Sequence, residues 1–170
     1  MKLTATDEGF DIYKPEKGSS FGYRYGPSLI MNADGSIDAY FSAPGVSGEW
    51  DWITYRHSPD GGENWTEELK VLAPTPDSPD FYSCCDPGAI KIGDYYYLGY
   101  TSTVNADGID NNVFAARSKN PEGPYEKWNG NGWGGFAEYV GDRAEDGTPW
   151  SFASHRATIP SCTYSENSEI

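Results

Sequence analysis

The fold of this 170-residue chain is decided by the stretch from Cys85 to Thr103, which reads CDPGAIKIGDYYYLGYTST. Its aromatic and β-branched residues, interrupted by the turn Gly93-Asp94, indicate two antiparallel strands joined by a hairpin. Sliding the chain against itself by sixty residues aligns an upstream stretch with it over roughly forty positions. The identical pairs are Pro27 with Pro87, Ile30 with Ile90, Asp34 with Asp94, Tyr40 with Tyr100, Ser42 with Ser102, and Ser58 with Ser118. Ordered matches at one fixed period predict a structural repeat.

Each repeat contains four segments with the alternation and the residue types of β-strands. The expected strands are 28–31, 37–41, 52–56 and 69–72 in the first repeat, and 89–92, 95–100, 113–116 and a weaker 125–128 in the second. Four antiparallel strands per repeat form the blade of a β-propeller. The sequence therefore predicts an all-β fold with about two propeller blades, at residues 24–75 and 84–135 after an N-terminal lead-in.

The expected ring of blades is incomplete. A propeller closes with about 4–8 blades, and the repeat does not continue beyond residue 135. Residues 136–170 lack strand alternation, which predicts either a broken third blade or an irregular tail. Because blades without neighbours expose apolar faces, self-association of the chain is also expected.

The formal net charge of −14 narrows the classes of partner. An acidic surface repels phosphate, so neither nucleic acid nor an anionic membrane is expected to bind. Aromatic residues make up 15% of the chain; such rings form strands and cores and can also stack on sugars, so the composition suits a carbohydrate ligand without requiring one. No metal or other cofactor is predicted, because His57 and His155 are isolated and Asn105–Asp110 lacks the spacing of a calcium loop.

The cysteines and the N-terminus bear on the cellular compartment. Cys84, Cys85 and Cys162 make no disulfide framework and are expected to be buried thiols, with a Cys84–Cys85 disulfide as the alternative. Residues Met1–Glu8 contain no apolar region, so no signal peptide is expected in the chain. The localisation stays open.

A turn motif, Ser58-Pro59-Asp60-Gly61-Gly62-Glu63-Asn64-Trp65, follows the third expected strand. Asp60 is expected to accept hydrogen bonds from turn amides, and Trp65 to pack back on the hairpin. The motif resembles the Asp-box of sialidases and other propeller proteins, in which it stabilises the fold. A sialidase is nevertheless the weaker interpretation, because no arginine triad can be assigned in the chain.

The stretch from Cys85 to Thr103 resembles the Asp-Pro-x-x-Ile…Gly-x-Tyr-Tyr-x-x-Tyr segment that begins a blade in five-bladed glycoside hydrolases of family 43 and their relatives. The segment from Ala116 to Tyr125 is similar to the Ala-x-Ser-x-x-x-x-Gly-Pro-Trp stretch of that family. The resemblance extends from about residue 24 to residue 135. It implies a hydrolase that cleaves glycosidic bonds of a poly- or oligosaccharide by carboxylate acid/base catalysis, in a funnel at which the inner strands begin.

The resemblance also implies which residues form the site. Asp86, fixed by Pro87 at the start of an inner strand, is the expected catalytic carboxylate, either as general base or as a group that tunes a second carboxylate. The expected substrate-binding residues are Arg24, Tyr25, Trp50, Asp51, Trp52 and Tyr82. Two features depart from the family, since the Glu motif of the general acid is missing and Gly26 replaces the Asp in the first blade. The alternative is a non-catalytic carbohydrate-binding or structural propeller segment.

Overall fold

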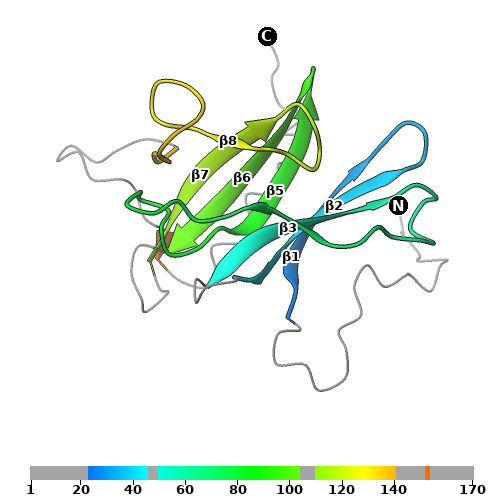
Figure 1. Cartoon of the computed structure of the whole chain (residues 1–170), viewed down its shortest axis with the longest axis horizontal. Coiled ribbons are helices and arrows are strands. Elements are labelled where there is room, and N and C mark those ends of the chain that lie inside the picture. The colour runs from blue at the N-terminus through cyan, green and yellow to red at the C-terminus, as the bar shows by residue number, and fades with distance from the viewer. Residues whose placement is uncertain (1–22, 46–49, 104–109, 141–151, 154–170) are drawn as a thin grey trace, which may run out of the picture.

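The structure, a computed structural model, describes residues 23–45, 50–103, 110–140 and 152–153 (Figure 1). Blade 1 is an antiparallel sheet of β1 (Tyr25–Met31), β2 (Ile37–Pro44), β3 (Asp51–Ser58) and β4 (Leu69–Leu72). Blade 2 repeats this order with β5 (Cys85–Ile92), β6 (Tyr95–Thr103), β7 (Asp110–Ser118) and β8 (Glu126–Lys127), and β9 (Phe152–Ala153) pairs with β7.

The prediction of two four-stranded blades is confirmed. Each expected strand is present, and the weak fourth strand of the second repeat is reduced to the 2 residues of β8. Within the described residues no helix is long and apolar enough to span a membrane.

The hydrophobic core lies between the two blades. Its most buried large side chains are Tyr40, Ile53 and Tyr55 of blade 1 and Leu98, Tyr100 and Phe114 of blade 2, all at most 3% exposed. The innermost strands, β1 and β5, lie beside each other and are joined by a hydrogen bond of 2.9 Å from the Ala89 N–H to Ser28 Oγ (Figure 1). Burial of each such side chain stabilises the fold by about 1.5–3 kcal/mol, so the blades depend on each other for stability.

The register of the second blade corrects the ungapped sixty-residue alignment. In blade 1, Tyr40 of β2 pairs with Ser28 and Tyr55. In blade 2, the residues sixty positions later on β5 and β7, Gly88 and Ala115, both pair with Gly99. Gly99, and not Tyr100, is therefore the structural equivalent of Tyr40, and the expected match of Ser42 with Ser102 is wrong for the same reason.

The cause is a shorter hairpin in blade 2. Five residues, 32–36, separate the paired Met31 and Ile37, whereas four residues, 92–95, separate the equivalent pair Lys91 and Tyr96. A shift of one residue turns every side chain of a strand to the opposite face. As a result Tyr40 points from blade 1 toward blade 2, and Tyr100 points back from blade 2 into the same core.

A buried ion pair fixes the connection between the blades. The Lys127 ammonium of β8 contacts the Asp80 carboxylate, and the two side chains are 7% and 0% exposed. Lys127 Nζ also donates to the Ala73 carbonyl at 2.5 Å, and the Tyr100 hydroxyl donates to Asp80 at 2.9 Å. The segment that leads into β5 is thereby attached to the outermost strand of blade 2.

The turn that follows β3 is closed by its own side chains. Asp60 Oδ1 accepts a hydrogen bond of 2.8 Å from the Asn64 N–H, and Trp65 Nε1 donates to the Gly62 carbonyl at 3.0 Å. The bond from the Asn64 side chain is the main cause that lowers the pKa of Asp60. These contacts stabilise the hairpin, and the hydrogen bond from a turn amide to Asp60 is one that the sequence predicts.

Cys84 and Cys85 are buried free thiols, as predicted, and burial raises the pKa of Cys84 well above its ordinary value. Cys162, His155 and most of the Asn105–Asp110 segment lie outside the described residues. Of the expected tail, Ala137 is buried in the core and the Val140 N–H donates to the Val113 carbonyl at 2.9 Å. The limits of the blades and the nature of residues 136–170 stay predictions.

Candidate functional site

Asp86 lies at the start of β5 with its backbone in the left-handed region, at φ 50°. Its N–H donates to Ser42 Oγ of blade 1 at 2.8 Å, and its Oδ2 accepts a hydrogen bond of 2.8 Å from Thr101 Oγ1. The register of β5 against β6 shifts between Cys85 and Gly88, as at a β-bulge. One oxygen of the half-buried carboxylate is thus fixed, while Oδ1 accepts no hydrogen bond from a described residue.

Gly26 occupies the equivalent bulge in blade 1, with φ 59°. A Cβ atom on Gly26 would lie 3.4 Å from Asp86 Oδ1 and 3.5 Å from Asp86 Cα. Glycine is therefore favoured at this position by its backbone angle, and the second blade packs directly against it. The two bulges lie against each other where β1 and β5 begin, and we call this end of the blades the site end.

Asp51, the first residue of β3, is buried at the site end with 8% exposure. Its Oδ1 accepts a hydrogen bond of 2.6 Å from the Tyr23 hydroxyl, and its Oδ2 accepts one of 2.8 Å from the Tyr25 hydroxyl. The Cys84 N–H donates to the Asp51 carbonyl at 2.9 Å, which connects the start of β3 to the segment before Asp86. Residues far apart in the sequence therefore meet at one place.

The hydroxyls of Tyr23 and Tyr25 and the thiol of Cys85 are neutral at pH 7, because the pKa of each group is raised. The pKa of Tyr25 is raised strongly, by burial first and then by the neighbouring Cys85 and Asp51. Burial, together with the charge of Asp86, raises the pKa of Cys85 to about 12. Tyr25 therefore acts as a hydrogen-bond donor to Asp51. Among the residues that the structure describes, no group of three or more His, Cys, Asp or Glu side chains could hold a metal ion.

The other expected substrate-binding residues divide into two groups. Trp50 and Tyr82 lie at the site end, where the Trp50 N–H donates to the Tyr82 carbonyl at 3.3 Å and the Trp50 side chain is 42% exposed. Trp52 follows Asp51 in β3, so its side chain points to the other face of the sheet, where Lys70 Nζ lies 5.4 Å from the ring centre. The Arg24 guanidinium is engaged by Glu68 and not by Asp51 or Asp86, since it forms a bidentate pair with the Glu68 carboxylate at 2.9 and 2.5 Å.

Sequence reasoning missed three residues of the site end: Tyr23, Ser42 and Thr101. Tyr23 could have been found, because residues two apart in an extended segment share a face, and Tyr25 was already a candidate. Ser42 and Thr101 are the cross-strand partners of Tyr25 and Cys85, so their positions depend on the register of each hairpin.

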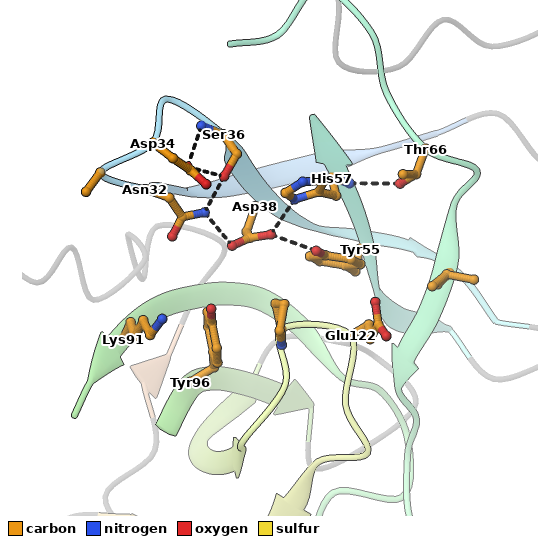
Figure 2. Close-up of a pocket in the computed structure, with 13 residues that line it drawn as sticks. Asn32, Asp34, Ser36, Asp38, Tyr55, His57, Thr66, Lys91, Tyr96 and Glu122 are labelled. Carbon is orange, nitrogen blue, oxygen red and sulfur yellow. Dashed lines mark hydrogen bonds and ion pairs between the residues drawn. The ribbon is translucent and has the colours of Figure 1, made fainter. Parts of the chain in front are cut away.

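A separate pocket of about 650 Å³ is lined by residues of both blades near the turn between β1 and β2 (Figure 2). Asn32 and Asp38 border it from blade 1, while Lys91 and Tyr96 face it from blade 2 (Figure 2). The turn 32–36 lines this pocket, whereas the site end lies at the start of β1, so the two regions are distinct.

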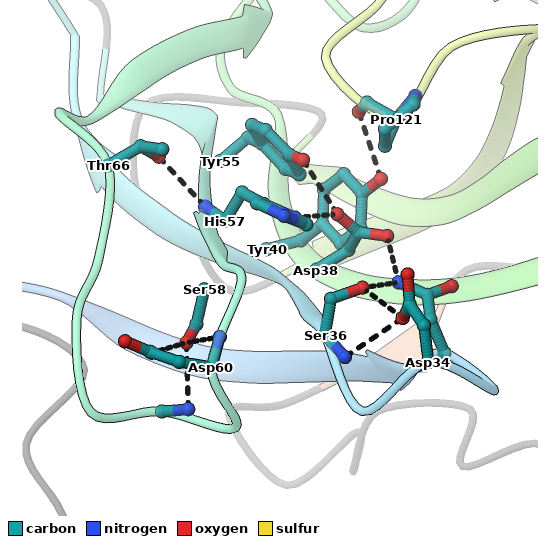
Figure 3. A network of polar contacts seen from close by, with 12 residues as sticks. Asp34, Ser36, Asp38, Tyr40, Tyr55, His57, Ser58, Asp60, Thr66 and Pro121 are labelled. Carbon is teal, nitrogen blue, oxygen red and sulfur yellow. Dashed lines mark hydrogen bonds and ion pairs between the residues drawn. The ribbon is translucent and has the colours of Figure 1, made fainter.

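Asp38 is the centre of a network of polar contacts at that pocket. Asp38 accepts hydrogen bonds from the Tyr55 hydroxyl at 2.6 Å and from Asn32 Nδ2 at 2.8 Å, and it pairs with His57 Nδ1 at 2.9 Å (Figure 3). The Asp38 side chain is 2% exposed, so these contacts compensate for its burial. The arrangement holds the β1–β2 turn against β3, and we assign it a structural role.

Comparison with solved structures finds glycoside hydrolases. One match is Zg3597, a family 117 enzyme of the marine bacterium Zobellia galactanivorans, with 21% identity and a TM-score of 0.55 over 69% of this chain and 41% of that one. A second is a thermostable family-43 glycoside hydrolase, with 21% identity and a TM-score of 0.53 over 64% and 38% of the two chains. A third is the GH43_1 enzyme of Xanthomonas citri complexed with xylotriose, with 25% identity and a TM-score of 0.50 over 62% and 31%.

These similarities show the fold: the chain consists of β-propeller blades of the kind found in these hydrolases. The chain spans less than half the length of each structure that it matches. No protein-family model and no curated protein matches the sequence.

Proposed function

We propose that the site end binds a poly- or oligosaccharide and that Asp86 is a carboxylate of glycosidic-bond hydrolysis. The observation that carries this proposal is the contrast with Gly26, which has the same left-handed backbone at the same bulge without a side chain. The fold of a blade therefore needs no carboxylate here, and an L-residue in this conformation costs about 1–2 kcal/mol more than glycine. Asp86 thus carries a side chain at a position where Gly26 shows that the fold needs none, and this supports a functional role for its carboxylate.

The contacts of Asp86 suit a general base. Thr101 orients the carboxylate through Oδ2, which leaves Oδ1 available to accept a proton from an attacking water molecule. Hydrolysis by this route needs a second carboxylate as general acid. Both oxygens of Asp51 already receive phenol hydrogen bonds, so we do not assign the general acid to Asp51.

The test is the variant Asp86→Asn, because Asn tolerates the left-handed backbone and keeps the shape of the side chain. Xylotriose is the first substrate to use, since it is bound in the Xanthomonas citri enzyme. Loss of a general base lowers the rate of hydrolysis by about 10²–10⁴-fold. Product formation is measured by chromatography, with Asp94→Asn in the exposed β5–β6 turn as the matched control. Equal rates in the wild-type chain and Asp86→Asn would refute the catalytic role.

A non-catalytic carbohydrate-binding segment is the second candidate. It is favoured by the structural bonds of Asp86, whose N–H and Oδ2 join β5 to β2 and β6. If this alternative holds, the wild-type chain binds xylotriose without cleaving it, and the only effect of Asp86→Asn is a lower affinity for xylotriose. Isothermal titration calorimetry alongside the chromatographic assay distinguishes the two candidates.

A further inference from the structure

Two tyrosines at the site end share one polar anchor, the carboxylate of Asp51. The Tyr23 and Tyr25 hydroxyls donate to its two oxygens at 2.6 and 2.8 Å. The Tyr23 hydroxyl also lies 2.9 Å from the Trp50 carbonyl, so it borders the backbone of another aromatic residue. Hydrogen bonds to an ionised acceptor are short and about twice as strong as neutral ones, so they hold both phenols firmly.

Tyr25 borders the carboxylate of Asp86. It directly precedes Gly26, where a Cβ atom would lie 3.5 Å from Asp86 Cα. Its cross-strand partner is Ser42, whose Oγ accepts the hydrogen bond of the Asp86 N–H. The Asp86 charge also contributes to the raised pKa of Tyr25. Three features of the structure thus place Tyr25 at the edge of the Asp86 site.

The rings are accessible although their hydroxyls are anchored. Tyr25 is 39% exposed and Tyr23 is 46% exposed, while Asp51 is only 8% exposed. The ring centroids of Tyr23 and Tyr25 lie 6.1 Å apart with 35° between the planes, so the rings form one tilted surface. An aromatic side chain that is fixed at its hydroxyl has lost most of its rotational freedom, and this lowers the entropic cost of binding a ligand.

We infer that Asp51 is a positioning residue that holds Tyr25 as a stacking platform for a sugar ring beside Asp86. This inference rests on the proposed carbohydrate site and changes the role expected for Asp51 there. Both Asp51 oxygens are engaged by phenols, so the carboxylate orients the platform instead of binding a sugar hydroxyl. The ligand group that fits is the apolar C–H face of a pyranose or furanose ring, stacked on Tyr25.

The test is a double-mutant cycle on xylotriose affinity, measured by calorimetry with the variants Tyr25→Leu, Asp51→Asn and their combination. We expect Tyr25→Leu to weaken binding by about tenfold, which corresponds to about 1.4 kcal/mol. If Asp51 acts through Tyr25, Asp51→Asn weakens binding in the wild-type background and has no further effect in Tyr25→Leu. Independent, multiplying effects of the two substitutions would overturn the inference and leave the carbohydrate site intact.

Tyr25→Phe provides a second route if Asp51→Asn does not fold, because it keeps the ring and removes only the anchored hydroxyl. Weaker binding by Tyr25→Phe supports the positioning role, and wild-type affinity of this variant overturns it. Tyr95 is a half-buried tyrosine at the opposite end of β6. The variant Tyr95→Leu is therefore the matched control and should bind xylotriose with wild-type affinity. If the wild-type chain shows no binding of xylotriose at millimolar concentrations of the sugar, the proposed site and this inference both fail.

Discussion

The two blades have the same backbone and different chemistry at the site end. Both inner strands have a left-handed second residue followed by proline, Gly26-Pro27 in blade 1 and Asp86-Pro87 in blade 2. Blade 1 places Tyr25 before this residue, whereas blade 2 places the buried thiol of Cys85 there. Blade 1 thus contributes an aromatic side chain and blade 2 contributes a carboxylate. The repeat supplies the geometry, and substitutions within it supply the site.

The blades also differ in how their outer strands are attached, and this difference predicts the largest effect. Lys127 of β8 is buried against Asp80, whereas Lys70 of β4 is exposed and donates to the Pro44 carbonyl. Lys127→Met leaves the Asp80 charge buried without its partner, so we expect a loss of about 3–5 kcal/mol in the free energy of unfolding. Urea denaturation followed by tryptophan fluorescence measures it.

Lys70→Met is the matched control in blade 1, with an expected change within about 0.5 kcal/mol. Equal losses for Lys70→Met and Lys127→Met would show that the buried ion pair does not distinguish the blades.

Substitutions of two glycines, one in each blade, test the backbone conformation assigned to the two blades. Gly26→Ala introduces a Cβ at a residue with φ 59°, a backbone conformation that disfavours L-residues. We therefore expect it to lower the free energy of unfolding by about 1–2 kcal/mol. Gly99, the structural equivalent of Tyr40, has no positive φ, and a Cβ there would lie 3.9 Å from the Gly88 carbonyl. Gly99→Ala should be neutral or stabilise by about 0.4–1 kcal/mol. The same urea denaturation measures both, and a reversed order would contradict the assigned bulge.

Tyr40→Phe tests the contact between the blades. The Tyr40 hydroxyl donates to the Pro121 carbonyl at 2.9 Å, so its removal should cost about 0.5–1.5 kcal/mol at pH 7. Burial raises the pKa of Tyr40 above its ordinary value of 10.0, and its contribution to stability is therefore present below pH 10 and declines above it. The deficit of Tyr40→Phe should shrink as the pH rises past 10. A deficit that stays constant up to pH 11 would contradict this account.

Asp60→Ala should have the smallest effect, because the turn after β3 is exposed. Its bonds to Asn64 lower the pKa of Asp60 below the ordinary 3.8, so the stabilisation is present above pH 3.8 and is lost as the pH falls below it. We expect a slightly lower melting temperature at pH 7 and no difference from the wild-type chain near pH 2. Asn120→Ala, at the equivalent turn of blade 2, is the control, and a difference for Asp60→Ala that persists in acid would exclude this mechanism.

The ungapped repeat shows how far sequence reasoning extends. Residue types and alternation located all the strands of both blades, since period-2 patterns reflect a half-buried sheet. The same alignment paired Tyr40 with Tyr100, which face each other across the core instead of occupying equivalent positions. Sequence similarity cannot detect a one-residue difference in turn length when both strands are rich in aromatic residues. The paired backbone hydrogen bonds settle the register.

The sequence by itself determined the blades, their turns and the position of Asp86-Pro87 at the start of an inner strand. These features follow from local preferences: alternation, glycine and proline at turns, and a motif that is contiguous in the chain. Only the tertiary structure brought Tyr23, Tyr25 and Asp51 together beside Asp86, turned Trp52 to the other face and paired Arg24 with Glu68. The physical reason is that the face of each side chain depends on strand register, and the site depends on how two sheets pack.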